Sequence, residues 1–435
     1  MLKLSQSPNS QAYISLASFK GQNHIEYIAK RQHFLKTNHT PKKYWTLDNF
    51  NSDKLEGVQN GLKVLGNLTM TQIKSIAERS LALILQRGCN NMCAHCFADA
   101  RPESFYKKEN SISKINIEDF KNFCDDIVSL NNKLGFNIFN KKNKYDYQTL
   151  FLDADSSMIQ AKDKDGKEYD YLDLSKMLHD SCNKEVLFDT AGWNIQDKKT
   201  QNRIDKLVQK FNDNYNKYKF IHFNLSFNPF HSLHYTSIQR KKEGKYDIAE
   251  KLDDIYATRM ANTINTLLPI FLNHPDNFSI ISRSFENFEN KNTEGFQQID
   301  LAELYDKTLD KLKNIFYEKF IDEYSEKELD NEFEKIKHYF YQNCVQTATR
   351  IGITGRLTKR FDYKNFRKTL DEEFPNANDK IIQKNMPAGL IDLNGKFYIT
   401  NYLETFPTNI QLNYTNKDKL TAPINPNLHD HTVKF

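Results

Sequence analysis

Three cysteines within eight positions are the residues of this chain best suited to chemistry. Cys89, Cys93 and Cys96 lie in the stretch CNNMCAHC, whereas the whole chain of 435 residues holds only six cysteines. Thiolates are soft ligands for iron and zinc, and three of them on one loop can converge on one metal centre. A 4Fe-4S cluster normally takes four cysteine ligands, so three ligands leave one iron open to a substrate or cosubstrate. The spacing therefore predicts a reactive metal centre.

A zinc site is the alternative for the same cysteines. Structural zinc needs a fourth Cys or His, and the next cysteine, Cys124, lies on the apolar face of an expected helix. A c-type haem is excluded because the sequence reads CAHC and not CxxCH.

Composition and charge narrow the class of protein. The 61 basic and 56 acidic residues give a formal charge of +5 and are interspersed, so we expect no nucleic-acid partner. The first residues lack the apolar core of a signal peptide, and no apolar run approaches the roughly 18 residues needed to cross a bilayer. We therefore expect no membrane association and a cytoplasmic location, where cysteines seldom form disulfides and a tight cluster indicates metal or redox chemistry.

Short apolar runs alternate with helical patterns from residue 79 onward. Strands are expected at 79–86, 147–157, 184–194, 217–231, 277–285 and 349–357, and helices at 116–135, 171–182, 198–212, 246–271 and 299–341. Six such strands predict an α/β fold with a parallel sheet, closed or partly closed into a barrel, with ligands at the carboxyl ends of the strands.

The expected domain organisation has three parts. Residues 1–78 have no clear period and read as an N-terminal extension, and residues 79–360 form the barrel core. Residues 361–435 form a C-terminal cap, in which two alternating runs joined at Asn394 and Gly395 predict a β-hairpin appendage.

The motif CxxxCxxC at the end of the first strand resembles that of the radical S-adenosylmethionine (radical SAM) superfamily, and the resemblance covers roughly residues 80 to 360. It implies a partial (β/α)6 TIM-like barrel and a 4Fe-4S cluster on Cys89, Cys93 and Cys96. The open iron would chelate S-adenosyl-L-methionine, which an electron from the cluster cleaves to methionine and a 5'-deoxyadenosyl radical. That radical abstracts a substrate hydrogen. The resemblance also implies oxygen sensitivity and an electron donor such as flavodoxin or ferredoxin.

Further residues are assigned to the cosubstrate only by this resemblance. His95 occupies the position before the third cysteine, whose backbone lies near the adenine in the family. The second strand ends in LDADSSM, where the family has a Gly-Gly-Glu-like segment. In this departure, Asp153 or Asp155 would accept the ammonium and Ser156 would be the small residue, or the segment is a turn with solvated side chains.

The later strands supply the remaining candidates. Asn224 and Ser226 share one face of the fourth strand, and Ser282 and Arg283 lie on the fifth; they match positions that hold the ribose and the carboxylate. Ile353 and Gly355 of GITGRL match the adenine-contacting backbone segment. For Asn224, Ser226, Ser282 and Arg283, the alternative is a polar strand end without a role in binding.

The remaining cysteines and three histidines have no role fixed by the motif. The remaining cysteines, Cys124, Cys182 and Cys344, are scattered, so auxiliary clusters are not expected; Cys344 is either a hydrogen-atom donor to a substrate radical or a core cysteine. His231, His234 and His274 are expected to be surface or structural residues, with acid–base catalysis as the alternative.

The sequence thus supports two hypotheses. One is a radical SAM enzyme that acts on a peptide or small metabolite. The other is a non-catalytic iron–sulfur or zinc-binding protein on a degenerate barrel.

Overall fold

The computed structural model describes residues 50–93, 96, 100–109, 111–139, 149–194, 196–227, 231–284, 302–344, 349–350, 379–386, 388–400, 404–421, 428 and 430–435. These residues form an α/β fold with two compact units. The inserted unit takes the described residues of Asp189–Ile351. The split unit takes those of Thr40–Phe188 and Gly352–Phe435.

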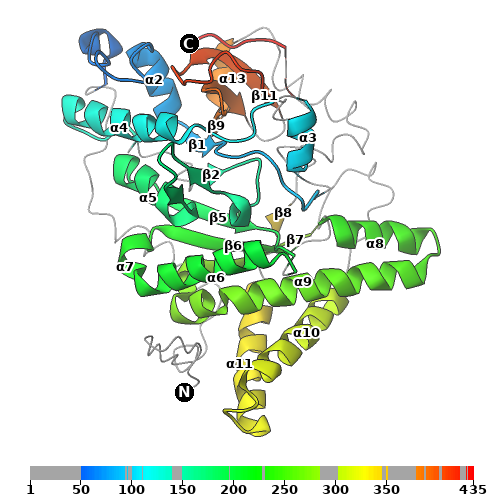
Figure 1. The fold of residues 1–435 in the computed structure, drawn as a ribbon. Helices are drawn as coiled ribbons and strands as arrows, with labels where there is room; N and C mark the ends of the chain where they lie inside the picture. Colours follow the sequence, from blue (N-terminus) through cyan, green and yellow to red (C-terminus); the bar gives the residue numbers. More distant parts are fainter. Residues whose placement is uncertain are drawn as a thin grey trace. The chain divides into compact units, whose positions relative to one another are not determined.

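The split unit contains a mixed sheet with the order β11-β10-β9-β1-β2-β5 (Figure 1). Its strands are β1 (Ser80–Leu83), β2 (Thr149–Phe151), β5 (Val186–Thr190), β9 (Ala388–Ile391), β10 (Lys396–Thr400) and β11 (Thr405–Gln411). β9, β1, β2 and β5 run parallel, and β10 is antiparallel to both β9 and β11. A separate antiparallel pair joins β3 (Ala161–Lys162) to β4 (Glu168–Tyr169).

Helices α4 and α5 lie side by side against the parallel strands of this unit (Figure 1). The helical elements of the split unit are η2 (Ser52–Leu55), α2 (Met70–Ala77), α3 (Glu103–Lys108), α4 (Ile117–Leu134), η3 (Ser156–Met158), α5 (Tyr171–Cys182) and α13 (Asp379–Asn385). An aromatic row joins helix to strand, because Phe151 of β2 meets Phe120 at 6.5 Å and Tyr171 at 5.3 Å between ring centroids. Edge-to-face contacts of this kind stabilise the helix–sheet layer beyond the buried area alone.

The inserted unit is built on three parallel strands, β6 (Ile221–Phe227), β7 (Phe278–Ser284) and β8 (Thr349–Arg350). Its helical elements are α6 (Lys198–Asp213), α7 (Tyr215–Tyr218), α8 (Ser232–Lys242), α9 (Tyr246–Asn273), η4 (Pro275–Asn277), α10 (Ala302–Phe320) and α11 (Glu326–Cys344). The long helix α9 lies beside α6, α8 and α10 (Figure 1). In the part of the chain that the structure describes, no helix combines the length and the apolar composition that a bilayer crossing requires.

The α/β alternation and its local signals are confirmed. Helix α4 begins after Asn116, whose side chain accepts a hydrogen bond from the Glu118 N–H, and ends at Gly135 with φ of 69°. The predicted hairpin is also present as β9 and β10. It does not stand apart as an appendage, however: β9 pairs in parallel with β1 and so continues the sheet. The described strands form no closed barrel.

One predicted helix is wrong in extent. The sequence predicts a helical stretch over residues 299–341, whereas the chain forms two helices, α10 and α11, with a break between Phe320 and Glu326. At the break, Ser325 donates its N–H and its hydroxyl to the Glu328 carboxylate, at 3.0 and 2.7 Å. The sequence SEKE carries this helix-start signal, which is strong enough to begin a new helix without Gly or Pro.

Candidate functional site

The cysteine loop, residues 89–101, follows the buried strand β1. The chain stays buried from Leu81 to Gly88 and reaches Cys89 six residues after β1 ends. Gly88 has φ of 120°, and a Cβ there would lie 3.1 Å from Glu103, so this turn requires glycine. The Cys89 N–H donates to the Arg101 carbonyl at 2.9 Å, which brings the two ends of the loop together. The loop therefore lies beyond the carboxyl end of a buried strand, as the sequence predicts.

The three cysteines of the loop are half-buried and carry thiols rather than disulfides. The Cys96 N–H donates to the Cys93 carbonyl at 3.2 Å, and the Ala100 N–H donates to the Cys96 Sγ at 3.3 Å. Burial, and to a smaller extent the neighbouring Asp155 carboxylate and Cys96, raise the pKa of the Cys89 thiol to about 12.

The donor set fits a thiophilic metal by its chemistry. Soft thiol ligands on one loop suit iron–sulfur clusters and zinc, and a backbone N–H directed at Sγ is the kind of contact that tunes such centres. Among the residues that the structure describes, however, no group of three His, Cys, Asp or Glu side chains is arranged to hold a metal ion. Convergence of the three cysteines on one centre therefore stays a prediction.

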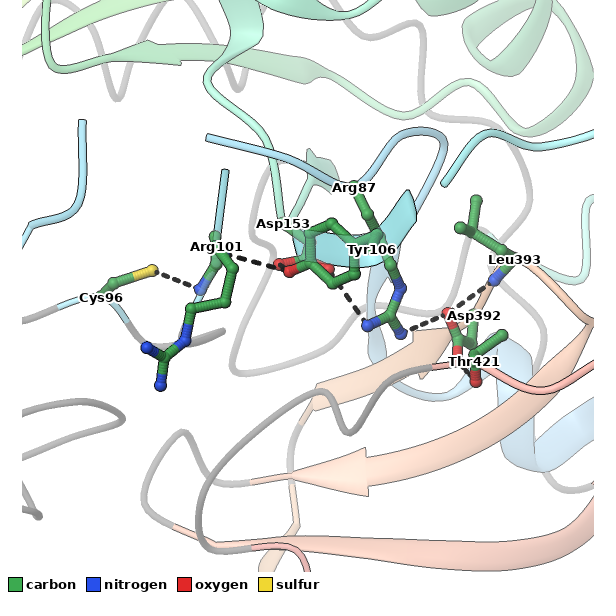
Figure 2. Close-up of polar contacts among 9 residues, drawn as sticks. Arg87, Cys96, Arg101, Tyr106, Asp153, Asp392, Leu393 and Thr421 are labelled. Carbon is green, nitrogen blue, oxygen red and sulfur yellow. Dashed lines mark hydrogen bonds and ion pairs between the residues drawn. The ribbon is translucent and has the colours of Figure 1, made fainter. Parts of the chain in front are cut away.

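A buried guanidinium precedes the loop by two residues (Figure 2). Arg87 Nη2 lies 2.8 Å from Asp392 Oδ1, and Arg87 Nη1 lies 3.3 Å from Asp153 Oδ2. The three side chains are at most 1% exposed. Burial lowers the pKa of Arg87, but the charges of Asp392 and Asp153 outweigh this effect and raise the pKa above its ordinary value. A charge of this kind is stable in the interior only because carboxylates flank it.

Asp153 connects this guanidinium to the far end of the loop. The Tyr106 hydroxyl lies 3.4 Å from Asp153 Oδ1 and accepts a hydrogen bond from the Arg101 N–H at 3.1 Å. Burial, and then the charge of Asp153, raise the pKa of Tyr106 above its ordinary value. Asp153 also has a left-handed backbone, with φ of 68°, and its carbonyl accepts from the Gly88 N–H at 3.1 Å.

Asp155 contacts the loop from the same segment. Its Oδ1 accepts from the Ser157 N–H at 3.0 Å and from the Ser157 hydroxyl at 2.6 Å, which caps η3. Its Oδ2 accepts from Asn91 Nδ2 at 2.9 Å, and Asn91 belongs to the cysteine loop. The neighbouring Ser156 is buried. The structure thus brings Asp153 and Asp155 to the cysteine loop, where this chain's own groups contact both carboxylates.

The inserted unit holds the next candidates on β6. Asn224 and Ser226 are buried and alternate with apolar residues, as the sequence predicts for one face of a strand. Asn224 Oδ1 accepts from the Ser279 hydroxyl of β7, and Ser279 Oγ lies 3.0 Å from His222 Nε2. Sequence reasoning missed His222 and Ser279, although the pattern HFNLSF places His222 on the face of Asn224 and Ser226.

Two histidines after β6 are buried rather than on the surface. His231 Nδ1 lies 2.8 Å from the Tyr256 hydroxyl, and His234 Nδ1 lies 2.7 Å from Asp253 Oδ1. Lys241 Nζ lies 3.0 Å from Asp253 Oδ2. Burial alone would raise the pKa of Asp253, but the bonds and charges of its partners lower that pKa to about 2. Both histidines therefore have structural partners.

The third histidine is half-buried in the same unit. His274 stacks on Tyr215 at 3.7 Å between ring centroids, and burial lowers the pKa of His274 to about 4. A ring that is neutral and stacked at ordinary pH supports the structural role expected from the sequence.

Other predicted residues lie wholly or partly outside the described residues. His95, Ile353 and Gly355 are not among them. Ser282 and Arg283 belong to β7 and Cys344 to the end of α11, but the placement of their side chains is not described.

Comparison of the chain with protein-family models, with curated proteins and with solved structures gave no match.

Proposed function

We propose that this protein is a radical SAM enzyme that uses S-adenosyl-L-methionine to abstract a hydrogen atom from a peptide or a small metabolite. The observation that carries the proposal is the cysteine loop itself. Three thiols at spacings of four and three residues follow the buried, parallel strand β1, and ligands gather at the carboxyl ends of parallel strands. The proposal includes a partial (β/α)6 barrel, a cytoplasmic location and an electron donor such as flavodoxin or ferredoxin.

The residues that would hold the metal are Cys89, Cys93 and Cys96. A 4Fe-4S cluster on these thiols would supply the single electron for reductive cleavage of the cosubstrate. The chain's own contribution is to fix the loop: Asn91 donates to Asp155, and the Ala100 N–H donates to Cys96 Sγ. Such contacts orient metal ligands and tune the centre they form.

The second candidate is a non-catalytic iron–sulfur or zinc-binding protein on a degenerate barrel. The observation that favours it is that the carboxylates of Asp153 and Asp155 both contact other groups of this chain. Asp153 contacts Arg87 and Tyr106, and Asp155 contacts Asn91 and Ser157. These are the groups that the resemblance assigned to the cosubstrate's ammonium.

Anaerobic reconstitution distinguishes the two candidates. The protein is supplied with iron and sulfide, and 5'-deoxyadenosine formation from S-adenosyl-L-methionine is measured with dithionite. Wild type is expected to form the product, and Cys93→Ala is expected to lose both the cluster and the product. The control is Cys182→Ala, which removes a buried cysteine of α5 and should keep the cluster.

Two outcomes would count against the enzyme. Zinc retained in place of an iron–sulfur chromophore would make the loop a structural metal site. A stable cluster whose electron paramagnetic resonance signal does not change when S-adenosyl-L-methionine is added would favour the non-catalytic protein.

A further inference from the structure

We propose that the C-terminal hairpin sets the position of the cysteine loop through the pair Asp392 and Arg87, which makes both of them positioning residues. The inference rests on the proposed function in taking the loop as the site that holds the metal. It assigns a role to the chain's tail that the cysteine motif does not indicate.

The hairpin holds Asp392 in a fixed orientation. Asp392 lies in the turn between β9 and β10, where its N–H donates to the Lys396 carbonyl at 3.0 Å. Its Oδ1 accepts from the Leu393 N–H at 2.7 Å, and its Oδ2 accepts from the Thr421 hydroxyl at 2.7 Å (Figure 2). With both oxygens directed, the carboxylate presents Oδ1 to Arg87 at a set place.

Arg87 links the hairpin to the start of the loop. Its guanidinium lies between two carboxylates, and its backbone N–H donates to the Ser113 carbonyl at 2.7 Å. A planar guanidinium with directed donors restricts the geometry of its partners more than a point charge does. Because Cys89 follows after only Gly88, a displaced Arg87 would displace the first thiol.

The same network reaches the other end of the loop. Asp153 contacts Arg87 on one oxygen and the Tyr106 hydroxyl on the other. Tyr106 in turn accepts from the N–H of Arg101, whose carbonyl accepts from the Cys89 N–H. Both ends of the loop therefore depend on one buried set of ion pairs and hydrogen bonds (Figure 2).

The chemistry of the network favours positioning over simple stabilisation. Replacement of a buried ion pair by well-packed apolar residues of similar volume is often neutral or stabilising, and the best-attested use of such a pair is to fix a register or a conformation. Arg87 and Asp392 are 305 positions apart and at most 1% exposed. The network thus joins the tail to the metal loop at a point where geometry controls metal affinity.

Cysteine alkylation in the metal-free protein tests the coupling. Wild type and Asp392→Asn are treated with iodoacetamide, and modification at each cysteine is followed by mass spectrometry. We expect Cys89, Cys93 and Cys96 to react about fivefold faster in the variant, because the loop opens locally. Cys124 and Cys182, buried in α4 and α5 of the same unit, should keep their rates.

Two further variants serve as a control and as a test for an intermediate effect. Asp126→Asn alters another buried carboxylate of the split unit, one that accepts from the N–H groups of residues 63–65 at 2.6 to 2.8 Å and has no contact with Arg87. It should leave the ratio of loop to helix alkylation unchanged. Thr421→Val keeps the ion pair but removes one bond to Asp392, and it should shift the ratio in the same direction by less than Asp392→Asn.

Iron content after reconstitution gives the second readout. Asp392→Asn is expected to lower iron affinity about tenfold, and Arg87→Lys to fall between it and wild type. Equal acceleration of the three loop cysteines and of Cys124 and Cys182, or a loop rate equal to wild type, would overturn the coupling. Failure of wild type to take up iron would instead count against the proposed function, and the alkylation comparison would still stand.

Discussion

Each unit of this protein holds a buried ion with two side-chain partners, and the two clusters differ in the sequence separation that their contacts span. In the split unit, the Arg87 cation lies between Asp153 and Asp392, and its bond to Asp392 spans 305 positions of sequence. In the inserted unit, the Asp253 anion lies between His234 and Lys241, and its bond to His234 spans only 19 positions.

The two clusters also differ in contact with water. The side chains around Arg87 are at most 1% exposed, whereas the Lys241 side chain beside Asp253 is 42% exposed. A charge that water can reach keeps part of its solvation when its partner is removed, and a fully buried charge does not. The comparison indicates that the Arg87 cluster fixes distant segments and that the Asp253 cluster strengthens a local helix pair.

The largest effect is expected from Arg87→Met. Removal of the guanidinium leaves Asp153 and Asp392 uncompensated in the interior, which should lower the free energy of unfolding by about 3 to 5 kcal/mol. Urea denaturation monitored by circular dichroism measures the loss. As a control, Arg240→Met removes a partly exposed arginine that pairs with Glu243 and should cost less than about 1 kcal/mol. Similar losses for the two variants would show that the buried Arg87 cluster contributes no more to stability than an exposed ion pair does.

A smaller, pH-dependent effect is expected from Asp253→Asn. The pKa of Asp253 in the folded protein, about 2, lies below the ordinary value of 3.8. The folded state therefore binds this proton more weakly than the unfolded state, and the stabilisation is complete above about pH 4. At pH 7 the substitution should cost about 1 to 2 kcal/mol. In urea titrations the difference from wild type should shrink as pH falls from 4 toward 2; a constant difference would contradict the assigned pKa.

The smallest effect is expected from Lys241→Met. This exposed partner of Asp253 should contribute less than about 1 kcal/mol, and the contribution should disappear at roughly 1 M salt, where the screening length is short. The penalty of Arg87→Met should persist at the same salt concentration because its groups are shielded from solvent. Thermal melts of both variants and of wild type at low and high salt measure this difference. If salt changed the loss of stability equally in the two variants, the two clusters would not differ in their screening by solvent.

Local features of the fold were predictable from sequence. Asn116 and Gly135 mark the ends of α4, and Asn394 with Gly395 marks the turn of the β9–β10 hairpin, where Gly395 has φ of 80°. These signals are read from a few neighbouring residues whose backbone needs are fixed by their own chemistry. The break before α11 carried such a signal too, in Ser325 and Glu328, and was missed because the charged pattern continues through it.

Long-range features were not predictable in the same way. No local sequence pattern predicts that β9 pairs with β1. Strand pairing depends on which sheet edges are still unpaired when the other strands have formed, and that is a tertiary property. The partner of Arg87 was equally hidden, although a charged residue at the end of an apolar run indicates that a counter-ion must exist. The same holds for the candidate site. The sequence placed Asp153 and Asp155 near the cysteine loop, but it could not predict their partners, which come from the tertiary structure.

The pairing of β9 with β1 also has a consequence for the order in which the protein is made. β1 is synthesised early, and roughly 300 residues must follow before β9 exists, which at 5 to 20 residues per second takes about 15 to 60 s. During that interval one edge of β1 lacks its final neighbour, and an unpaired apolar edge is a template for wrong association. This edge of β1 is therefore expected to gain its final neighbour only after the hairpin has been synthesised, so the sheet is completed late.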